Sequence, residues 1–295
     1  MGSPRDEPYR DSNETQHYVT LTNDFEMSVY ETTQAEFEAI MDGWNPSCFG
    51  PNGNEFEHCP PYVLPDCGDN CPVEMVSWYD ALAYANQFSL AEGLTPCYIL
   101  WSTYCQDNSY VGANYMECMS KLKGGIKATK YSLHGVTSVY ECEGFRLPTE
   151  SEWEYAARAG TTSAFYSGPI STSVGNCSPP LDINLEKIAW YCGNTPNIEP
   201  NGFGRSTEPV GQKEPNAWGL YDITGNVKEW VWDGYGSYPG DVEDPEGVID
   251  APYVSSRGGS VGSGHAPCRN ANRGTNPSRD TRGLIGIRLV RTLPK

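Results

Sequence analysis

The chain lacks an apolar run of membrane-spanning length, and it is short of positive charge. A membrane-spanning helix needs about 20 consecutive apolar residues, and no run here approaches that length. Only 20 Lys and Arg stand against 38 Asp and Glu, so the net charge is −18. Nucleic-acid binding relies on clustered Lys and Arg, so this balance argues against DNA or RNA as a partner. The acidic surface favours solubility and attraction of cations instead.

Common catalytic motifs are also missing. The chain has four histidines, and they are widely scattered: His17, His58, His134 and His265. It contains no phosphate-binding loop and no Cys-x-x-Cys redox motif. The periodic self-similarity of helical or propeller repeats is absent as well. These absences argue against nucleotide-binding enzymes of the phosphate-loop type, dithiol redox enzymes and repeat proteins.

Cysteine, in contrast, is abundant. Eleven cysteines in 295 residues favour an oxidising compartment. No signal peptide is visible, and the opening Met1-Gly2-Ser3-Pro4 is typical of a start from which an export signal has been removed. We expect a protein that is secreted, periplasmic or at the cell surface, in a bacterium. Residues 1–16 are polar and aperiodic and predict a disordered tether, the possible stalk behind an upstream lipid anchor. Residues 17–295 then form one domain.

The cysteine spacing predicts five local disulfides and one free thiol. Two bridges are expected among Cys48, Cys59, Cys67 and Cys71, two among Cys97, Cys105, Cys118 and Cys142, and one between Cys177 and Cys192. Connectivity inside each group stays open. A zinc site made of the first four cysteines and His58 is the alternative, although its spacing matches no common zinc finger. Cys268 is left over in this count.

Three capping boxes predict where helices begin. Thr33 precedes a short helix with Phe37, Ile40 and Met41 on one side, and Ser77 precedes a longer one that Gly93 ends. Thr149 opens a third helix, Trp153–Ala159, that Gly160 stops. Residues 17–31 alternate like short strands. Trp153, Trp218, Trp230 and Trp232 are expected in or beside the core.

The stretch from Asn216 to Asp233 combines tryptophans with oxygen-bearing side chains and glycines. Its Thr-Gly-Asn-Val turn brings carbonyls and an amide oxygen close to the Glu229 carboxylate. Hard oxygen donors around a glycine turn suit calcium better than zinc or copper. A tight turn whose polar groups bond each other is the alternative.

Three blocks of sequence carry a family resemblance. They are, in chain order, the stretch from Gly144 to Arg158, then Gly225-Asn226-Val227-Lys228-Glu229-Trp230, and then Arg257-Gly258-Gly259-Ser260 with the later Gly286-Ile287-Arg288. They resemble the formylglycine-generating enzyme family, also called the sulfatase-modifying-factor domain, over about residues 17–292. The resemblance implies an α+β fold: a large, loop-rich variant of the C-type lectin-like fold.

The resemblance also implies a bound calcium ion. Its expected ligands are Gly225, Asn226, Val227 and Glu229, largely through backbone carbonyls. Lys228 replaces the family's usual Trp, which leaves these ligand positions intact but alters what covers them.

Copper, the cofactor of the catalytic members, is not expected here. Those members follow the Gly-Gly-Ser segment with two cysteines, five residues apart, that hold copper(I) and support oxidation of a sulfatase cysteine. In this chain Ser260 is retained, Ser263 stands at the first cysteine position and Cys268 at the second. A serine hydroxyl is a poor ligand for copper(I). Leu284 also stands where the family has Asn. We therefore expect no formylglycine production; a divergent metal-dependent oxidase using Cys268 is the alternative.

The favoured function is ligand binding through the C-terminal loops, residues 261–282. An Asn- and Arg-rich run suits adaptable hydrogen bonding to a peptide, protein or glycan. The expected ligand-binding residues are Trp230, His265, Arg269, Asn270, Asn272, Arg273, Asn276 and Arg279. This run also resembles the variable region of lectin-fold proteins diversified by retroelements, which is a further alternative. An ordinary surface loop is the simplest one.

Overall fold

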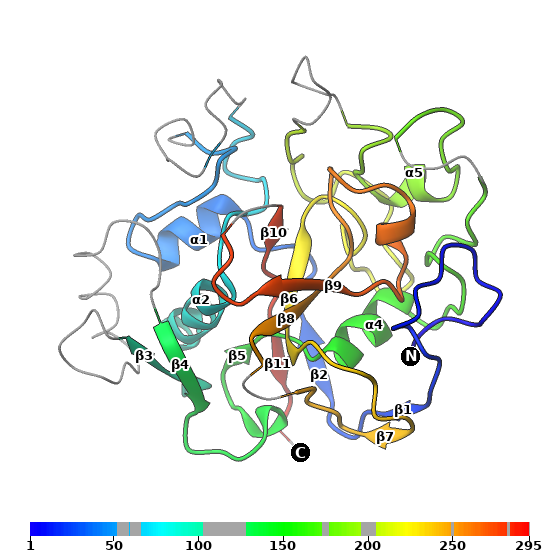
Figure 1. Cartoon of the computed structure of the whole chain (residues 1–295). Helices are drawn as coiled ribbons and strands as arrows, with labels where there is room; N and C mark the ends of the chain where they lie inside the picture. Colours follow the sequence, from blue (N-terminus) through cyan, green and yellow to red (C-terminus); the bar gives the residue numbers. More distant parts are fainter. Residues whose placement is uncertain are drawn as a thin grey trace.

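The computed structural model of the chain describes residues 1–51, 59, 66–102, 128–172, 177–195, 205–248, 251–281 and 284–294. Within these residues, no helix has both the length and the apolar character needed to cross a membrane. Figure 1 shows short strands and helices embedded in long connections.

Three of the helices begin directly after a predicted capping box, and the third of these therefore begins at Glu150, three residues before the expected Trp153. The helices are α1 (Gln34–Ile40), α2 (Trp78–Ala91), α4 (Glu150–Arg158) and the short α5 (Leu185–Ile188), with single 3-10 turns at η2 (Val139–Glu141) and η3 (Ala266–Cys268). The hydroxyls of Thr33, Ser77 and Thr149 each accept a bond from the third N–H of the following helix, and the acidic side chain there bonds back. Local hydrogen bonding therefore sets these starts.

The strands form small sheets. Their order is β1 (Val19–Thr20), β2 (Phe25–Met27), β3 (Tyr98–Ser102), β4 (Ala128–Leu133), β5 (Phe145–Arg146), β6 (Lys228–Gly234), β7 (Val242–Glu243), β8 (Tyr253–Arg257), β9 (Gly274–Pro277), β10 (Ile285–Gly286) and β11 (Val290–Thr292). The largest sheet has the order β10-β6-β8-β9, a second has the order β2-β11-β5, and β1 pairs with β7 and β3 with β4. Strands distant in sequence thus meet at the centre (Figure 1).

The core lies between α2 and the central strand β6. Trp230 and Trp232 are buried there, and Trp78 packs at a tilt against Trp232, with ring centroids 5.6 Å apart. Trp153 is also buried, as expected. Trp218 is not: its side chain is 48% exposed and lies against Tyr155. Its position corrects the expectation of a core residue, because it lies in a turn outside the central sheet.

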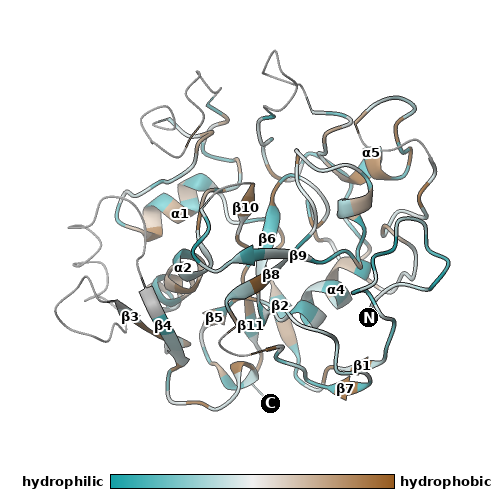
Figure 2. Ribbon diagram, viewed as in Figure 1, coloured by the Kyte–Doolittle hydropathy of each residue, from teal (hydrophilic) through white to brown (hydrophobic). Residues whose placement is uncertain are grey.

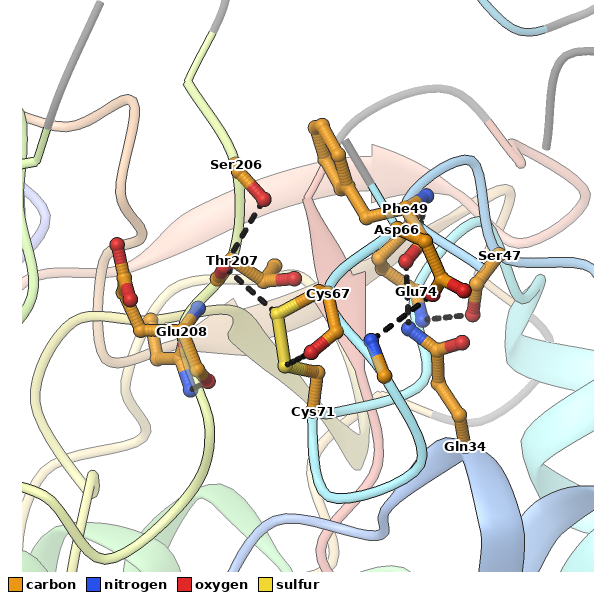
Figure 3. The surroundings of a disulfide bond; sticks show 12 residues. Gln34, Ser47, Phe49, Asp66, Cys67, Cys71, Glu74, Ser206, Thr207 and Glu208 are labelled. Atoms are coloured by element: carbon orange, nitrogen blue, oxygen red, sulfur yellow. Dashed lines mark hydrogen bonds between the residues drawn. A yellow bond between two sulfur atoms is a disulfide. The ribbon is translucent and has the colours of Figure 1, made fainter. Parts of the chain in front are cut away.

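The cysteine-rich loop is crosslinked as predicted. Cys48 bonds to Cys59 and Cys67 to Cys71, which rules out zinc binding by these sulfurs; His58 lies outside the described residues. Figure 3 shows the second bridge, whose Cys67 sulfur lies 2.8 Å from the Thr207 carbonyl oxygen. A third disulfide joins Cys177 and Cys192, also as predicted.

Cys97 and Cys142 are thiols in this structure rather than members of the expected bridges. Both are buried. Burial contributes most to raising the pKa of the Cys97 thiol, and the neighbouring Cys142 raises it further. Cys105 and Cys118 lie outside the described residues. Three thiols, counting Cys268, are therefore found in the described part of the chain, where the sequence count predicted one.

Residues 1–16, called the N-terminal segment below, pack against the domain instead of forming a tether. Figure 2 colours most of the segment hydrophilic, yet Ser3 and Glu14 are buried. The Gly2 N–H donates to Glu154 of α4 at 2.8 Å. Glu14 accepts two hydrogen bonds from the buried guanidinium of Arg269. The expectation of a disordered tether is corrected, because the buried guanidinium of Arg269 is paired with the carboxylates of Glu7 and Glu14 in this segment.

Candidate functional site

The Gly-Gly-Ser turn after β8 brings Ser260 against Cys268. Gly258 and Gly259 have φ values of 95° and 76°, which favour glycine. A Cβ atom on Gly259 would lie 2.5 Å from the Cys268 sulfur. Only glycine at this position therefore allows the turn to approach the thiol so closely.

Ser263 closes this turn through its hydroxyl group. Ser260 N donates to Ser263 Oγ at 3.0 Å, and the two hydroxyl oxygens lie 3.2 Å apart. Ser263 N in turn donates to Ser260 O at 2.8 Å. The three positions that the sequence singled out are thus brought together, but the serine at the first cysteine position makes structural hydrogen bonds.

Cys268 is buried at the end of η3, within a cluster that includes Phe165, Leu185 and Tyr191. Burial raises the pKa of its thiol to about 12, although the nearby Lys228 ammonium opposes this shift. The sulfur is therefore protonated at neutral pH. Copper(I) requires two soft thiolates, and this site supplies one thiol beside a hydroxyl and a cation. The donor set does not fit copper(I).

Lys228 was not predicted as part of this site. It is half-buried at the start of β6, and burial lowers the pKa of its amine while Cys268 raises it. The family resemblance gave the only signal, since Lys replaces the usual Trp at this position. A cation now faces the remaining sulfur.

Most of the expected ligand-binding residues are internal. Trp230 is fully buried in β6, and its indole N–H donates to Val76 O at 2.9 Å. His265 packs edge-on against Tyr9, and the buried Asn270 donates its backbone N–H to Ala164 O. These three residues are corrected from surface contacts to packing residues.

The arginines at 269 and 273 are ion-paired inside the protein. Arg269 contacts Glu7 and Glu14 of the N-terminal segment. Arg273 bonds to both carboxylate oxygens of Glu150, at 2.6 and 2.7 Å. An Arg that is buried needs such partners, since a lone buried charge costs several kcal/mol. These pairs occupy the donors that a ligand would need.

Three of the expected residues reach solvent. Arg279 is exposed, whereas Asn276 and Asn272 are half-buried. Asn276 lies in the edge strand β9, and Arg279 lines a neighbouring hollow of about 420 Å³. Its lining also includes Lys130 and Tyr131, which the sequence did not suggest. The surface part of the predicted site is thus the edge of β9 with this hollow, called the β9 surface below.

Asn226, in the expected calcium turn, connects three segments. It has a φ of 50°, a conformation that Asn tolerates. Its side-chain amide donates to Glu31 Oε2 at 2.8 Å and to Glu208 O at 3.0 Å, and its Oδ1 accepts from Glu208 N. The backbone oxygen accepts from Val261 N. Its oxygens are therefore already hydrogen-bonded, although each keeps a second lone pair.

Glu229 is paired with Arg288, which bonds to its Oε1 at 2.9 and 2.8 Å. The other oxygen accepts from the Trp153 indole N–H at 2.6 Å. The Arg288 guanidinium therefore compensates one negative charge at this turn.

Two further buried carboxylates share that single guanidinium. Burial raises the pKa of Glu31 well above its usual range, and the nearby Asp222 and Glu229 raise it further, against the effect of Arg288. Burial likewise raises the pKa of Asp222. Asp222 Oδ1 and Thr224 Oγ1 are buried with no hydrogen-bond partner among the described residues. Oxygen donors with excess negative charge fit a hard divalent cation.

The side chains alone do not complete a metal site. Within the described residues, no three acidic, histidine or cysteine side chains converge as a metal-holding cluster. Main-chain carbonyls of Gly225 and Val227 would have to supply the other donors, as the resemblance implies. Sequence reasoning missed Asp222, although it precedes Gly225 by only three residues. Glu31 gave no local signal because it is almost 200 residues away.

Comparisons with known proteins agree over nearly the whole chain. The family model of the sulfatase-modifying factor enzyme 1-like domain matches residues 1–293. The chaperone protein LppX of Paenibacillus barcinonensis is 35% identical over 257 residues, 83% of this chain and 72% of that protein. The formylglycine-generating enzyme of Streptomyces coelicolor is 32% identical over 172 residues, 54% of this chain and 50% of the enzyme.

Among solved structures, Treponema denticola variable protein 1 matches with a TM-score of 0.71 at 27% identity. The match covers 99% of this chain and 91% of that one. The expected loop-rich, C-type lectin-like α+β fold is thereby confirmed.

Proposed function

Since the chain belongs to the sulfatase-modifying factor enzyme 1-like family, we propose that it is an exported, non-catalytic member that binds a polypeptide through its C-terminal segment. Three disulfides among the described residues support export, because such bridges persist in oxidising compartments. The chain matches only 50% of the length of the Streptomyces coelicolor enzyme, so the proposal on catalysis rests on the residues of the site.

The observation that carries the proposal is the hydroxyl of Ser263 at the first metal-binding position, hydrogen-bonded to Ser260. The second position, Cys268, keeps its proton at neutral pH because its pKa is about 12. Oxygen activation by copper(I) in this family depends on two sulfurs, as the resemblance implies. A chain with one buried, protonated thiol has lost that chemistry but keeps the scaffold.

The β9 surface is the favoured contact for the ligand. Lys130 and Arg279 present two cations in a chain of net charge −18, beside the ring of Tyr131. β9 is also an edge strand, whose outer main-chain groups can pair with an extended segment. A polypeptide is preferred to a glycan because a relative that covers most of the chain is named a chaperone. The likeness to a variable protein supports a surface that tolerates diversification.

Reversal of one charge tests this surface. We expect Arg279→Glu to weaken binding of a permanently unfolded acidic polypeptide, carboxymethylated α-lactalbumin, by about tenfold, because it removes an attraction and adds a repulsion. Binding is measured by surface plasmon resonance at low salt. Lys187→Glu, an exposed residue of α5, is the matched control and should bind like the wild type. Equal loss in both variants would point to overall charge rather than to the β9 surface.

The non-catalytic part is tested on the same preparation, reduced and loaded with copper(I). A peptide with the Cys-x-Pro-x-Arg sequence should remain unoxidised, as judged by mass spectrometry. Aldehyde formation by the wild-type protein would refute the proposal. Aldehyde formation only in Ser263→Cys would support it, because it would show that one missing sulfur is the defect.

We also propose a structural calcium ion at the turn of Gly225, Asn226, Val227 and Glu229. The residues best suited to hold it are Asp222 and Glu229 through carboxylates, and Gly225 and Val227 through carbonyls. Burial keeps the pKa values of Glu31 and Asp222 raised, although Arg288 lowers both. Lys213 also lowers the pKa of Asp222. Bound calcium would stabilise the ionised form of these two carboxylates. It would thereby hold the turn that positions β6.

Calcium should raise the melting temperature, and more so as the pH rises. The pKa values of Glu31 and Asp222 are raised in the fold, so without calcium their contribution to stability falls as the pH rises from the unfolded value through the folded one. Calcium should oppose this fall in stability at higher pH, because it binds the ionised carboxylates. At about 100 times its dissociation constant it should add about 2.7 kcal/mol.

Differential scanning fluorimetry with calcium or a chelator, at pH 5.5 and pH 8, measures this effect. Asp222→Asn should remove most of the calcium-dependent shift, whereas Asp69→Asn, at an exposed position, should retain it. A melting temperature that calcium leaves unchanged at both pH values would identify an ordinary turn.

A further inference from the structure

A second groove lies beside the free edge of β2, away from the residues of the β9 surface. It encloses about 770 Å³, within the range of ligand-binding pockets. We define the β2 groove by six of its lining residues, Leu21, Phe25, Met27, Tyr155, Trp218 and Leu220. Figure 1 shows β2 lying between β11 and α4, and the groove is walled by residues of β2 and α4.

The main-chain groups of β2 are only half used. Ser28 N donates to Leu289 O, and Leu293 N donates to Asp24 O. The main-chain N–H and C=O groups of the alternate residues Asp24, Glu26 and Ser28 therefore point toward β11. By the same alternation, the N–H and C=O groups of Phe25 and Met27 point to the other side. In the described part of the chain these groups have no hydrogen bond outside the β2–β11 pairing.

The protein itself begins to use this edge at one end. Tyr221 N donates to Val29 O at 3.0 Å, and Val29 lies on the same side as Met27 and Phe25. Among the described residues, the hydrogen bonding to this edge stops at Val29. Leu220 and Trp218, which precede Tyr221, line the groove instead of pairing with β2. An extended segment that follows on from Tyr221 along the edge would meet the unpaired groups of Met27 and then of Phe25.

The groove offers apolar and aromatic surface to such a segment. Tyr155 and Trp218 are 55% and 48% exposed, and their rings lie 4.8 Å apart. Large aromatic side chains exposed together mark interaction sites more often than single exposed residues do. Met27 and Leu220 line the same hollow.

The charge of the groove selects a basic partner. Asp24 lines it and is exposed, and no ion pair involves its carboxylate within the residues described. The other charged side chains in the lining, Glu154 and Arg158, are paired with each other at 2.9 Å, and Glu154 is also paired with Arg257. The N-terminal ammonium of Met1 also lies in the lining and donates a hydrogen bond to His17 O at 3.1 Å. The two aromatic rings also attract cations through their faces. The net charge of the whole chain, −18, also favours a partner of positive charge.

We propose that the β2 groove binds an extended, basic segment of a partner polypeptide as an added strand on β2. The backbone of the segment pairs with Phe25 and Met27, apolar side chains enter the groove, and Lys or Arg side chains meet Asp24 and the aromatic rings. This site is independent of the β9 surface, which presents cations and therefore favours ligands of opposite charge.

Fluorescence anisotropy with a labelled Lys-Val-Lys-Val-Lys-Val-Lys peptide tests the site. Trp218→Ala and Asp24→Lys should each weaken binding by about tenfold or more. Circular dichroism shows whether these variants keep the fold, and both positions are exposed. Arg279→Glu is the control, and its binding should be unchanged or stronger. This control separates a failure here from a failure of the proposed β9 function.

N-methylation of the peptide tests strand addition without changing the protein. Methyl groups on every second amide block one edge of an extended peptide, and methyl groups on the alternate amides block the other edge. One of the two peptides should lose binding and the other should retain it, and hydrogen exchange at the Phe25 and Met27 amides should slow only with the binding peptide.

Several results would overturn the proposal. Equal binding of both methylated peptides would exclude strand addition. Preference for a Glu-Val-Glu-Val-Glu-Val-Glu peptide, or Trp218-dependent binding of an oligosaccharide without peptide binding, would assign the groove to another ligand class. Concentration-dependent dimerisation that protects the Phe25 and Met27 amides without peptide would identify a second copy as the occupant.

Discussion

Replacement of Arg257 by alanine should lower the free energy of unfolding by about 3–5 kcal/mol, the loss typical of breaking a buried ion pair. Arg257 is 1% exposed and bonds to both Glu150 and Glu154. It also donates to the backbone oxygens of Asn270 and Ala271, and so joins α4 to the C-terminal segment. Its removal takes a buried donor away from Glu154 and from the two carbonyls, whereas Glu150 keeps its hydrogen bonds from Arg273.

The stability lost in Arg257→Ala should be smaller at acidic pH. Burial raises the pKa of Glu154, but Arg257 and Arg158 more than offset this and hold the pKa below its usual value. A carboxylate of lowered pKa stabilises the fold above its unfolded pKa and loses that contribution as the pH falls through the folded value. Urea unfolding at pH 7 and pH 3.5 measures both effects. Arg279→Ala, an exposed control, should change stability by less than about 0.5 kcal/mol.

A comparable loss for Arg257→Ala and Arg279→Ala would contradict the network. Restoring part of the lost stability with a second substitution, Glu154→Gln, would support it, because that substitution removes the charge left uncompensated.

Trp230→Ala should cost about 3–5 kcal/mol, as large-to-small substitutions of buried aromatic residues do. The ring is 0% exposed in the central strand β6, and its N–H is bonded to Val76 O. Urea unfolding measures the loss. Trp218→Ala is the matched control, because its side chain is 48% exposed and should cost far less. The pair also separates two roles for Trp230.

If Trp230 contacted a ligand at the surface, its alanine variant would remain stable and lose only binding. The buried geometry predicts the reverse order: stability falls first, and any loss of binding follows from unfolding. Trp230→Phe keeps most of the ring but leaves the Val76 carbonyl unpaired, so an intermediate loss is expected.

Local features of the fold were predictable from the sequence. The capping boxes at Thr33, Ser77 and Thr149 involve residues three apart, so the signal and the hydrogen bonds lie in the same few residues. The disulfides Cys48–Cys59, Cys67–Cys71 and Cys177–Cys192 also join cysteines close in sequence. Ser260, Ser263 and Cys268 meet for the same reason, since a glycine turn and one 3-10 turn connect them.

The exposure of polar residues was not predictable in this way. Arg269 and Asn272 resemble surface residues in sequence, yet they hold Glu14 of the N-terminal segment, more than 250 residues away. The same contact explains why a hydrophilic segment is ordered rather than a tether. Likewise, the carboxylate excess at the calcium turn depends on Glu31, which no pattern near Glu229 announces.

The sequence by itself determined the helix starts, the local crosslinks, the family and the lost sulfur at Ser263, because each is recorded in adjacent residues. Tertiary structure alone decided which charged groups became internal, which edge strands kept unpaired main-chain groups, and that Trp218 rather than Trp230 faces solvent. The physical reason is that burial, charge compensation and free hydrogen-bonding edges depend on partners brought together from distant parts of the chain.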